Sequence, residues 1–296
     1  LSAAMSSTVS LGRLQAVLDR FEVTIAAAND LVVLSDYKIV VIADDSGSMR
    51  WPSTFEEQQR LGILSVASIS SQQDLQMVFA KLASLKGQGQ LTSRWDELKD
   101  TLTLIVEMST CFDPSGIDIN FLNRGAVRGV KLASDSEFVR AMDAEPLGGT
   151  PLTERLRTVV ATYSGECPVL LMILTDGEPD DGPAAFCSQL SQVIRKECTD
   201  TKFRVQIMAC TGDSDAVAWL NKLDEDFKEV DVTDDYHSEK LEVVRANLAK
   251  QFTRGDWLIK SMLGPVSQKY DGWDEAKSQI KVDTSACSCA AASSPC

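Results

Sequence analysis

The chain has 296 residues, is 44% hydrophobic and carries a formal net charge of −14 at pH 7. Its length allows one large domain with additions or two small domains, and its apolar content is ordinary for a globular protein. The negative charge argues against nucleic acid as a partner, because phosphate backbones attract basic surfaces. Solubility is a simpler explanation of this charge than attraction to basic partners.

Composition also bears on the cellular compartment. Disulfide scaffolds are typical of small secreted domains, whereas this chain is neither short nor dominated by loops, so we expect a reducing compartment. No stretch approaches the roughly 18 consecutive apolar residues of a membrane helix, and no signal peptide is visible. We therefore predict a cytoplasmic protein without direct membrane insertion, or an organellar one if a targeting segment precedes residue 1. The eight cysteines are at positions 111, 167, 187, 198, 210, 287, 289 and 296.

The first predicted element is an amphipathic helix before the first strand. Apolar residues recur there at helical spacing, which is typical of a helix that packs on a domain. They are Leu11, Leu14, Leu18, Phe21 and Ile25. We interpret residues 1–35 as an N-terminal helical extension.

The segment that follows predicts a buried strand ending in a cluster of oxygen-bearing side chains. Residues 38–43 (KIVVIA) are rich in β-branched side chains, and DDSGS comes directly after them. The side chains of Asp44, Ser46 and Ser48 can converge at the carboxyl end of this strand. One carboxylate and two hydroxyls form an all-oxygen ligand set, which suits Mg²⁺ better than zinc or copper.

Two later segments can complete this ligand set. Thr150 lies in a glycine-containing loop just before Pro151, which suits the first position of a helix. A second apolar strand, residues 169–174, leads directly into Thr175, Asp176 and Gly177. Ligands gather beyond the carboxyl ends of neighbouring strands in an open parallel sheet, so three loops can offer five residues to one cation. Helix capping and turn formation explain each motif alone, but the three motifs in this order favour a metal site. The five predicted ligands are Asp44, Ser46, Ser48, Thr150 and Asp176.

The remaining elements alternate between helix and strand. Ser93 is a suitable N-cap for a helix with Asp96 three residues on, and Pro183 opens another helix. Strands are predicted at 116–122 and 203–209, and Val217, Leu220 and Leu223 lie on a helix after the second of these. This alternation indicates a parallel α/β sheet.

The predicted metal residues, in this order, resemble the metal-ion-dependent adhesion site of von Willebrand factor type A (VWA) domains. The resemblance spans residues 36–265, and the segments 229–240 and 255–264 resemble the closing elements of a stand-alone intracellular subgroup. It implies an α/β fold with a doubly wound, mostly parallel sheet flanked by helices, followed here by a tail at 266–296. It also implies metal-dependent protein binding, in which an Asp or Glu carboxylate of a partner completes the shell of Mg²⁺, with Mn²⁺ or Ca²⁺ as alternatives.

One region departs from that family. In the resemblance the metal loop leads almost directly into the helix near Trp95, whereas about forty residues intervene here, at roughly 51–92. Two apolar patterns, at 55–69 and 75–85, predict a helical hairpin that returns at 87–89 (GQG). This insertion either contributes to the partner surface, or covers the metal until a partner arrives, or packs away from the site.

We therefore predict a metal-dependent protein–protein interaction module, not an enzyme, with Asp44 and Asp176 neutralising the cation directly or through water. Asp45 either adds charge behind the ligands or faces solvent, and we favour solvent. One alternative is a structural subunit that docks into a larger assembly through its helical additions. A Mg²⁺-dependent phosphatase of the haloacid-dehalogenase type is a weaker alternative, because Ser46 stands where that family has its second Asp; Asp180 and Asp181 could pass for its late acidic pair. The single histidine, His237, argues against a Ser–His–Asp triad. We expect the Cys-containing tail to be disordered.

Overall fold

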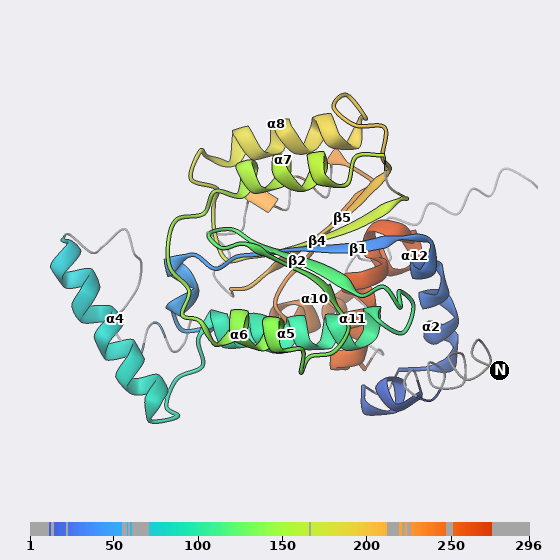
Figure 1. Ribbon diagram of the computed structural model, residues 1–296. Coiled ribbons are helices and arrows are strands. Elements are labelled where there is room, and N and C mark those ends of the chain that lie inside the picture. The colour runs from blue at the N-terminus through green and yellow to red at the C-terminus, as the bar shows by residue number, and fades with distance from the viewer. Residues whose placement is uncertain are drawn as a thin grey trace, which may run out of the picture.

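The computed structural model describes residues 15–21, 23–54, 71–165, 167–211, 226–246 and 251–273, together with positions 12, 58, 60, 219, 220 and 223. These residues build an α/β fold in which helices flank both faces of a central sheet (Figure 1). Of the helix predicted at Val217, Leu220 and Leu223, the last two residues are described, and both are helical and buried. Val217 and most of the tail after residue 265, including Cys287, Cys289 and Cys296, lie outside the described residues.

The sheet has six strands in the order β3-β2-β1-β4-β5-β6. All neighbouring strands are parallel except β2 and β3, which are antiparallel. The predicted mostly parallel α/β class is confirmed, and the arrangement is compatible with a Rossmann-like fold. The strands are β1 (Lys38–Ala43), β2 (Ile117–Phe121), β3 (Ala126–Val130), β4 (Val169–Thr175), β5 (Phe203–Ala209) and β6 (Val230–Thr233).

Alternate residues of the central strands enter two separate hydrophobic cores. Ile39 and Val41 of β1 belong to one core, and Val40 and Ile42 belong to the other. β4 divides in the same way, so both faces of these strands are buried. The continuous apolar runs in the sequence follow from this double burial, which is typical of parallel sheets covered by helices on both faces.

Helices α7 and α8 cover one face of the sheet, and α5, α6, α10 and α11 cover the other (Figure 1). The predicted N-cap is confirmed, because Ser93 and Asp96 form a capping box at the start of α5, and Pro183 opens α8 as expected. None of the helices within the described ranges is both long and apolar enough to cross a membrane. The helices that cover the two faces are α5 (Arg94–Ser109), α6 (Ser136–Asp143), α7 (Leu152–Thr162), α8 (Pro183–Ile194), α10 (Tyr236–Ala246) and α11 (Arg254–Leu263).

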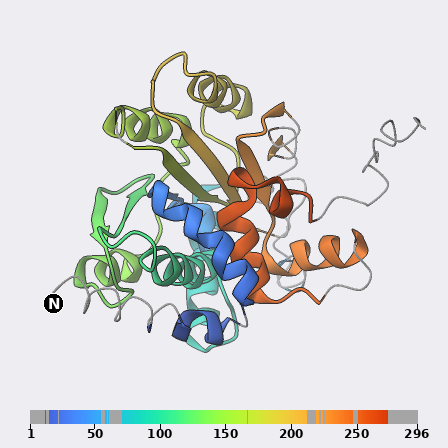
Figure 2. The same cartoon turned by 90° about the vertical axis from the view of Figure 1, so that its right-hand side faces the viewer.

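The N-terminal region differs from the single helix expected from the apolar pattern. Helical residues end at a turn at Phe21, and a new helix, α2 (Ile25–Asp30), begins after Thr24, whose side chain accepts a hydrogen bond from the Ala27 N–H. A 3-10 turn, η1 (Leu31–Asp36), then leads into β1. Figure 2 shows α2 beside α11 and the C-terminal α12 (Gln268–Asp271), and Tyr270 of α12 donates a hydrogen bond to Asp30. Both ends of the described chain therefore close over the same side of the sheet.

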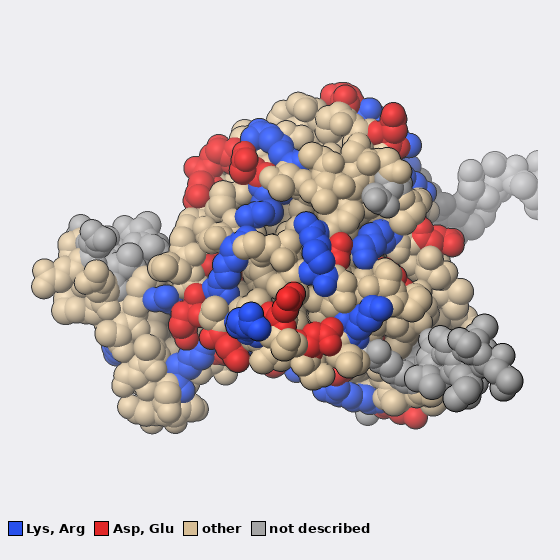
Figure 3. Space-filling model, viewed as in Figure 1, with Lys and Arg blue, Asp and Glu red and all other residues tan. Residues whose placement is uncertain are grey.

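The second helix of the predicted insertion is present as α4 (Gln72–Gly87), whereas the first, at 55–69, falls almost entirely outside the described residues. α4 projects from the body of the fold, and few charged side chains are visible on it (Figures 1 and 3). Its base is a small apolar cluster of Trp51, Leu82 and Leu91. The two ends of the insertion meet at an isolated bridge between Pro52 and Ser93.

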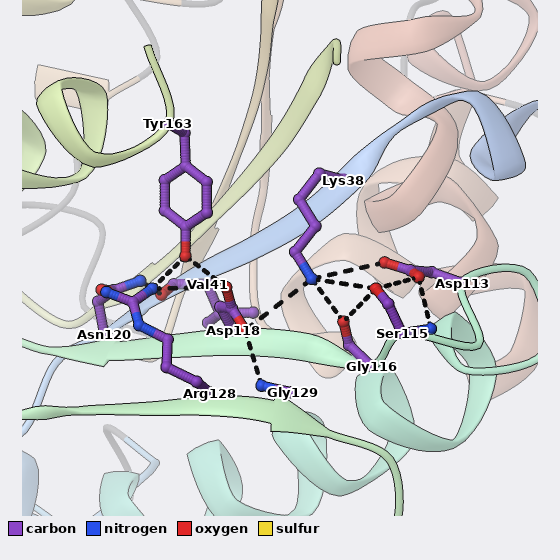
Figure 4. A network of polar contacts seen from close by, with 10 residues as sticks. All are labelled: Lys38, Val41, Asp113, Ser115, Gly116, Asp118, Asn120, Arg128, Gly129 and Tyr163. Atoms are coloured by element: carbon purple, nitrogen blue, oxygen red, sulfur yellow. Dashed lines mark hydrogen bonds and ion pairs between the residues drawn. The ribbon is translucent and has the colours of Figure 1, made fainter. Parts of the chain in front are cut away.

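A polar network holds the edge of the sheet at the amino-terminal half of β2 (Figure 4). Asp118 accepts hydrogen bonds from the Tyr163 hydroxyl and the Gly129 N–H, and it forms an ion pair with Arg128. Lys38 lies 3.9 Å from the same carboxylate. Burial, together with the hydrogen bond to Asp118, raises the pKa of Tyr163. Because each member has partners within the network, we assign it a structural role in holding β3, a short edge strand that we did not predict.

Candidate functional site

The candidate site lies where the order of the sheet reverses. From β1 the chain passes to β2 and β3 on one side, and then returns to β4 on the other side of β1. Asp44 directly follows β1 and Asp176 directly follows β4, and these two strands pair in parallel, with Ala43 opposite Leu174. The crevice beyond the carboxyl ends of strands at such a reversal is where open α/β sheets bind ligands.

Hydrogen bonds link four of the five predicted ligands into one cluster. Asp44 accepts a hydrogen bond from the Ser46 N–H at 2.8 Å, and the hydroxyl oxygens of Ser46 and Ser48 are 2.8 Å apart. The Ser48 hydroxyl in turn donates to Asp176 at 2.9 Å. Thr175 donates its hydroxyl to the second oxygen of Asp44 at 2.7 Å. Asp44, Ser46, Ser48 and Asp176 are therefore in mutual contact although 128 residues separate Ser48 from Asp176.

The loop that carries Thr150 packs against this cluster. The Gly148 carbonyl accepts a hydrogen bond from the Gly47 N–H at 3.0 Å, and the Thr150 N–H donates to Asp180 at 2.9 Å. Within the described part of the chain the Thr150 hydroxyl has no hydrogen-bond partner. The structure thus brings the Thr150 loop to the site, but it does not join the Thr150 hydroxyl to the other four predicted ligands.

Two glycines allow this loop to approach so closely. Gly148 has a φ of +115°, and a Cβ there would lie 2.3 Å from the Asn123 side chain. A Cβ at Gly149 would lie 2.5 Å from the Asp180 carboxylate. A side chain at Gly148 would be strained by this φ, and a side chain at either position would have to displace the Asn123 or Asp180 side chain, both of which hydrogen-bond to the Thr150 loop.

Arg94 is the one cation that pairs with a predicted ligand among the described residues, and sequence reasoning missed it. Its guanidinium donates to the Asp176 carboxylate at 2.7 Å, and the two side chains are 9% and 0% exposed. Its Nε is buried without a hydrogen-bond partner. Arg94 is placed by the end of the insertion, because its N–H donates to the Trp51 carbonyl at 2.9 Å.

Two buried carboxylates share this small volume. Asp44 is 0% and Asp176 1% exposed. Burial, followed by the charge of Asp176, raises the pKa of Asp44 to about 7. Placing a second cation between these acids would relieve both effects, because an opposite charge favours the ionised form of a carboxyl group.

The prediction that Asp45 faces solvent is wrong. Asp45 is 0% exposed and accepts a hydrogen bond from the Asn123 N–H at 2.7 Å. It also pairs with Arg124, whose Nε is 3.0 Å away. Successive residues after a strand point in opposite directions, and the turn between β2 and β3 folds over the side that Asp45 occupies. Asp45 therefore fixes that turn beside the site.

The late acidic pair has a role in supporting the Thr150 loop. Asp180 accepts the Thr150 N–H, and Asp181 accepts the Thr153 hydroxyl at 2.7 Å at the start of α7. Both carboxylates therefore help to hold the loop before α7.

The residues of the cluster fit a hard divalent cation. They present carboxylate and hydroxyl oxygens, which are the ligands that Mg²⁺ prefers, and Mg²⁺ keeps waters where protein ligands are absent. Among the described residues, no three His, Cys, Asp or Glu side chains are placed to hold a metal together. A metal site here therefore depends on the serine and threonine hydroxyls as well.

Comparison with known proteins adds no family assignment. No family model matches the chain, and no curated protein matches its sequence significantly.

Proposed function

We propose that this chain is a metal-dependent protein–protein interaction module of the VWA type. In this proposal Asp44, Ser46, Ser48, Thr150 and Asp176 hold Mg²⁺, and an Asp or Glu carboxylate of a partner protein binds the same cation. Mn²⁺ and Ca²⁺ are the alternative ions.

The observation that carries the proposal is the contiguous cluster at the reversal point of the sheet. Four oxygen-bearing side chains from two distant segments meet there, and two of them are carboxylates with almost no exposure. Buried carboxylates are costly unless they are paired, and within the described residues Asp44 has no ion-pair partner of its own. A bound cation supplies the missing compensation.

The charges of the cluster explain why a partner acid would bind. The five residues contribute at most two negative charges and three neutral hydroxyls. A divalent cation bound by such a set remains able to attract a further carboxylate, in place of a water that Mg²⁺ would otherwise keep. The protein's own part is to hold the oxygens in place, through Thr175 on Asp44 and through the Gly47–Gly148 hydrogen bond.

Thr150→Ala is a suitable variant for testing this function. The Thr150 hydroxyl has no hydrogen-bond partner in the described structure, so its removal deletes a proposed ligand at little cost to the fold. Thr158→Ala is a matched control, because Thr158 is an exposed residue of α7 whose hydroxyl bonds only within its helix. Calorimetric titration with Mg²⁺ should give binding to the wild type and to Thr158→Ala, and at least tenfold weaker binding to Thr150→Ala.

The partner test uses the same proteins as affinity baits in native extract, with Mg²⁺ or with EDTA. We expect partners that are lost both in EDTA and with Thr150→Ala, and retained with Thr158→Ala. The same proteins recovered under every condition would contradict a metal-dependent surface.

The shape of α4 favours a second candidate function, that of a structural subunit in a larger assembly. α4 projects from the domain (Figure 1), and its residue Met77 is 58% exposed. Deleting residues 55–90 and joining the ends with a short Gly/Ser linker tests this role while keeping the bridge between Pro52 and Ser93. Partners that survive EDTA but disappear with this deletion would identify docking through the insertion.

A further inference from the structure

A cavity of about 350 Å³ opens beside the candidate metal site, beyond the carboxyl ends of β5 and β6. Cys210, at the end of β5, is part of its wall, together with Glu97 of α5 and Trp257 of α11. Asp235, the residue just before α10, also lines it. None of these residues belongs to the cluster of predicted metal ligands.

The cavity and the metal cluster are neighbours. The Cys210 N–H donates to the Thr175 carbonyl at 2.8 Å, and Thr175 directly precedes Asp176. On the helix side, Glu97 lies three residues after Arg94 and so on the same face of α5, while Arg94 itself contacts Asp176. One bound molecule can therefore reach both places.

The charges around the cavity favour a cation. Three carboxylates line it, those of Glu97, Asp100 and Asp235, against the single guanidinium of Arg254. Burial raises the pKa of Glu97, so its ionised form is poorly solvated and would gain from a positive neighbour.

The remaining wall is suited to the aliphatic stem of a long basic side chain. Met208 and Trp257 are 1% and 4% exposed and give the cavity an apolar side. Lysine and arginine bury their methylene groups on such surfaces while the charged end reaches polar groups, and cations bind favourably over indole rings. An anionic ligand would meet three like charges, and a wholly apolar ligand would leave the carboxylates without solvent.

We propose that this cavity binds a lysine or arginine side chain of the same partner whose carboxylate binds the metal. The shared partner rests on the function proposed above, whereas the preference of the cavity for a cation does not. Partner recognition would then require an acidic and a basic residue close together.

The first experiment tests the cavity without the metal. The ¹⁵N-labelled protein is titrated in EDTA with N-acetyl-argininamide and with the neutral N-acetyl-citrullinamide, and the indole N–H signal of Trp257 is followed. We expect a saturable shift with the arginine compound and at least fivefold weaker binding of the citrulline compound. Equal binding of the two compounds would overturn the proposal.

Variants locate the binding. Glu97→Gln and the exposed Asp100→Asn should each weaken argininamide binding by about fivefold, while Glu137→Gln, on the exposed surface of α6, should leave it unchanged. Unchanged binding in both cavity variants would exclude this cavity as the cation site.

The second experiment tests the shared partner with peptides acetyl-Asp-(Gly)n-Arg-amide, with zero to three glycines, in Mg²⁺. Because the two groups are tethered, at least one peptide should bind about tenfold tighter than its citrulline analogue, and also about tenfold tighter than argininamide alone. EDTA should remove this gain in affinity. If Mg²⁺ binds but no peptide gains affinity, the shared partner is refuted. If Mg²⁺ itself does not bind, the proposed function fails together with the shared partner, but an argininamide site found in EDTA would stand.

Discussion

Replacing Arg94 by methionine tests the electrostatic account of the candidate site. Arg94 is the cation that pairs with one of the two buried acids, and its guanidinium is 2.7 Å from Asp176. Methionine keeps much of the apolar volume and removes the charge. The Asp44 and Asp176 carboxylates are then left without a positive neighbour among the described residues.

The expected magnitude follows from the burial of this pair. Because both side chains are less than one-tenth exposed, removing one partner leaves an uncompensated buried charge, which costs about 3–5 kcal/mol. For a chain of this size each kcal/mol lowers the melting temperature by about 2–4 °C, so we expect a loss of roughly 6–20 °C in EDTA. Arg20→Met is the control, because Arg20 is 57% exposed and its surface ion pair with Glu107 is worth about 1 kcal/mol at most.

The informative comparison is the response to Mg²⁺, measured by thermal unfolding with and without EDTA. Arg94 and a cation both compensate Asp176, so the variant without Arg94 should gain more stability from Mg²⁺ than the wild type does. A ligand at about 100 times its Kd stabilises by about 2.7 kcal/mol, which is readily measured. Equal gains in the variant and the wild type would refute the view that Arg94 and the metal act on the same carboxylate.

Three further predictions concern the surroundings of the site. Lys260→Met removes a fully buried ammonium 3.2 Å from Glu239, and chemical denaturation should show a loss of about 3–5 kcal/mol that an added Glu239→Gln partly restores. Gly148→Ala should weaken Mg²⁺ binding at least tenfold by calorimetry while circular dichroism stays unchanged, because alanine is strained at a φ of +115° and its Cβ would displace the Asn123 side chain that holds the Thr150 loop. Burial raises the pKa of Asp96, but hydrogen bonds from Ser93 and Lys86 outweigh it and leave the pKa below its ordinary value, so the stability from Asp96 is present above its unfolded pKa and lost as the pH falls through the folded one. In Asp96→Asn the free energy of unfolding should therefore fall less steeply as the pH is lowered. An unchanged pH dependence would contradict this role of the Asp96 carboxylate.

The central strands and the cluster were predictable for clear physical reasons. Residues 38–43 and 169–174 are buried on both faces, which leaves an uninterrupted apolar run in the sequence. Asp44, Ser46 and Ser48 alternate directly after such a run, so local geometry brings them together. By contrast, the link between these residues and Thr150 depended on the expected topology of an open parallel sheet, because a separation of about one hundred residues carries no local signal.

What the sequence could not indicate depends on long-range packing. Arg94 directly follows an N-cap and has the pattern of an exposed first-turn residue, but the return of the insertion turns it toward Asp176. Asp45 is buried only because the turn after β2 folds over it. β3 is short, contains Gly129 and is half-exposed, so its apolar signal is weak.

The meeting of the two ends of the insertion at Pro52 and Ser93 makes this point of the chain a natural site for engineering. The segment between them leaves and re-enters the domain at one place, and the entropy of closing a loop rises only slowly with its length. A folded reporter with adjacent termini could therefore replace residues 55–90 without altering the strand order. Such a reporter would be separated from Arg94 by only three residues, 91–93, and so would lie close to the acidic cluster.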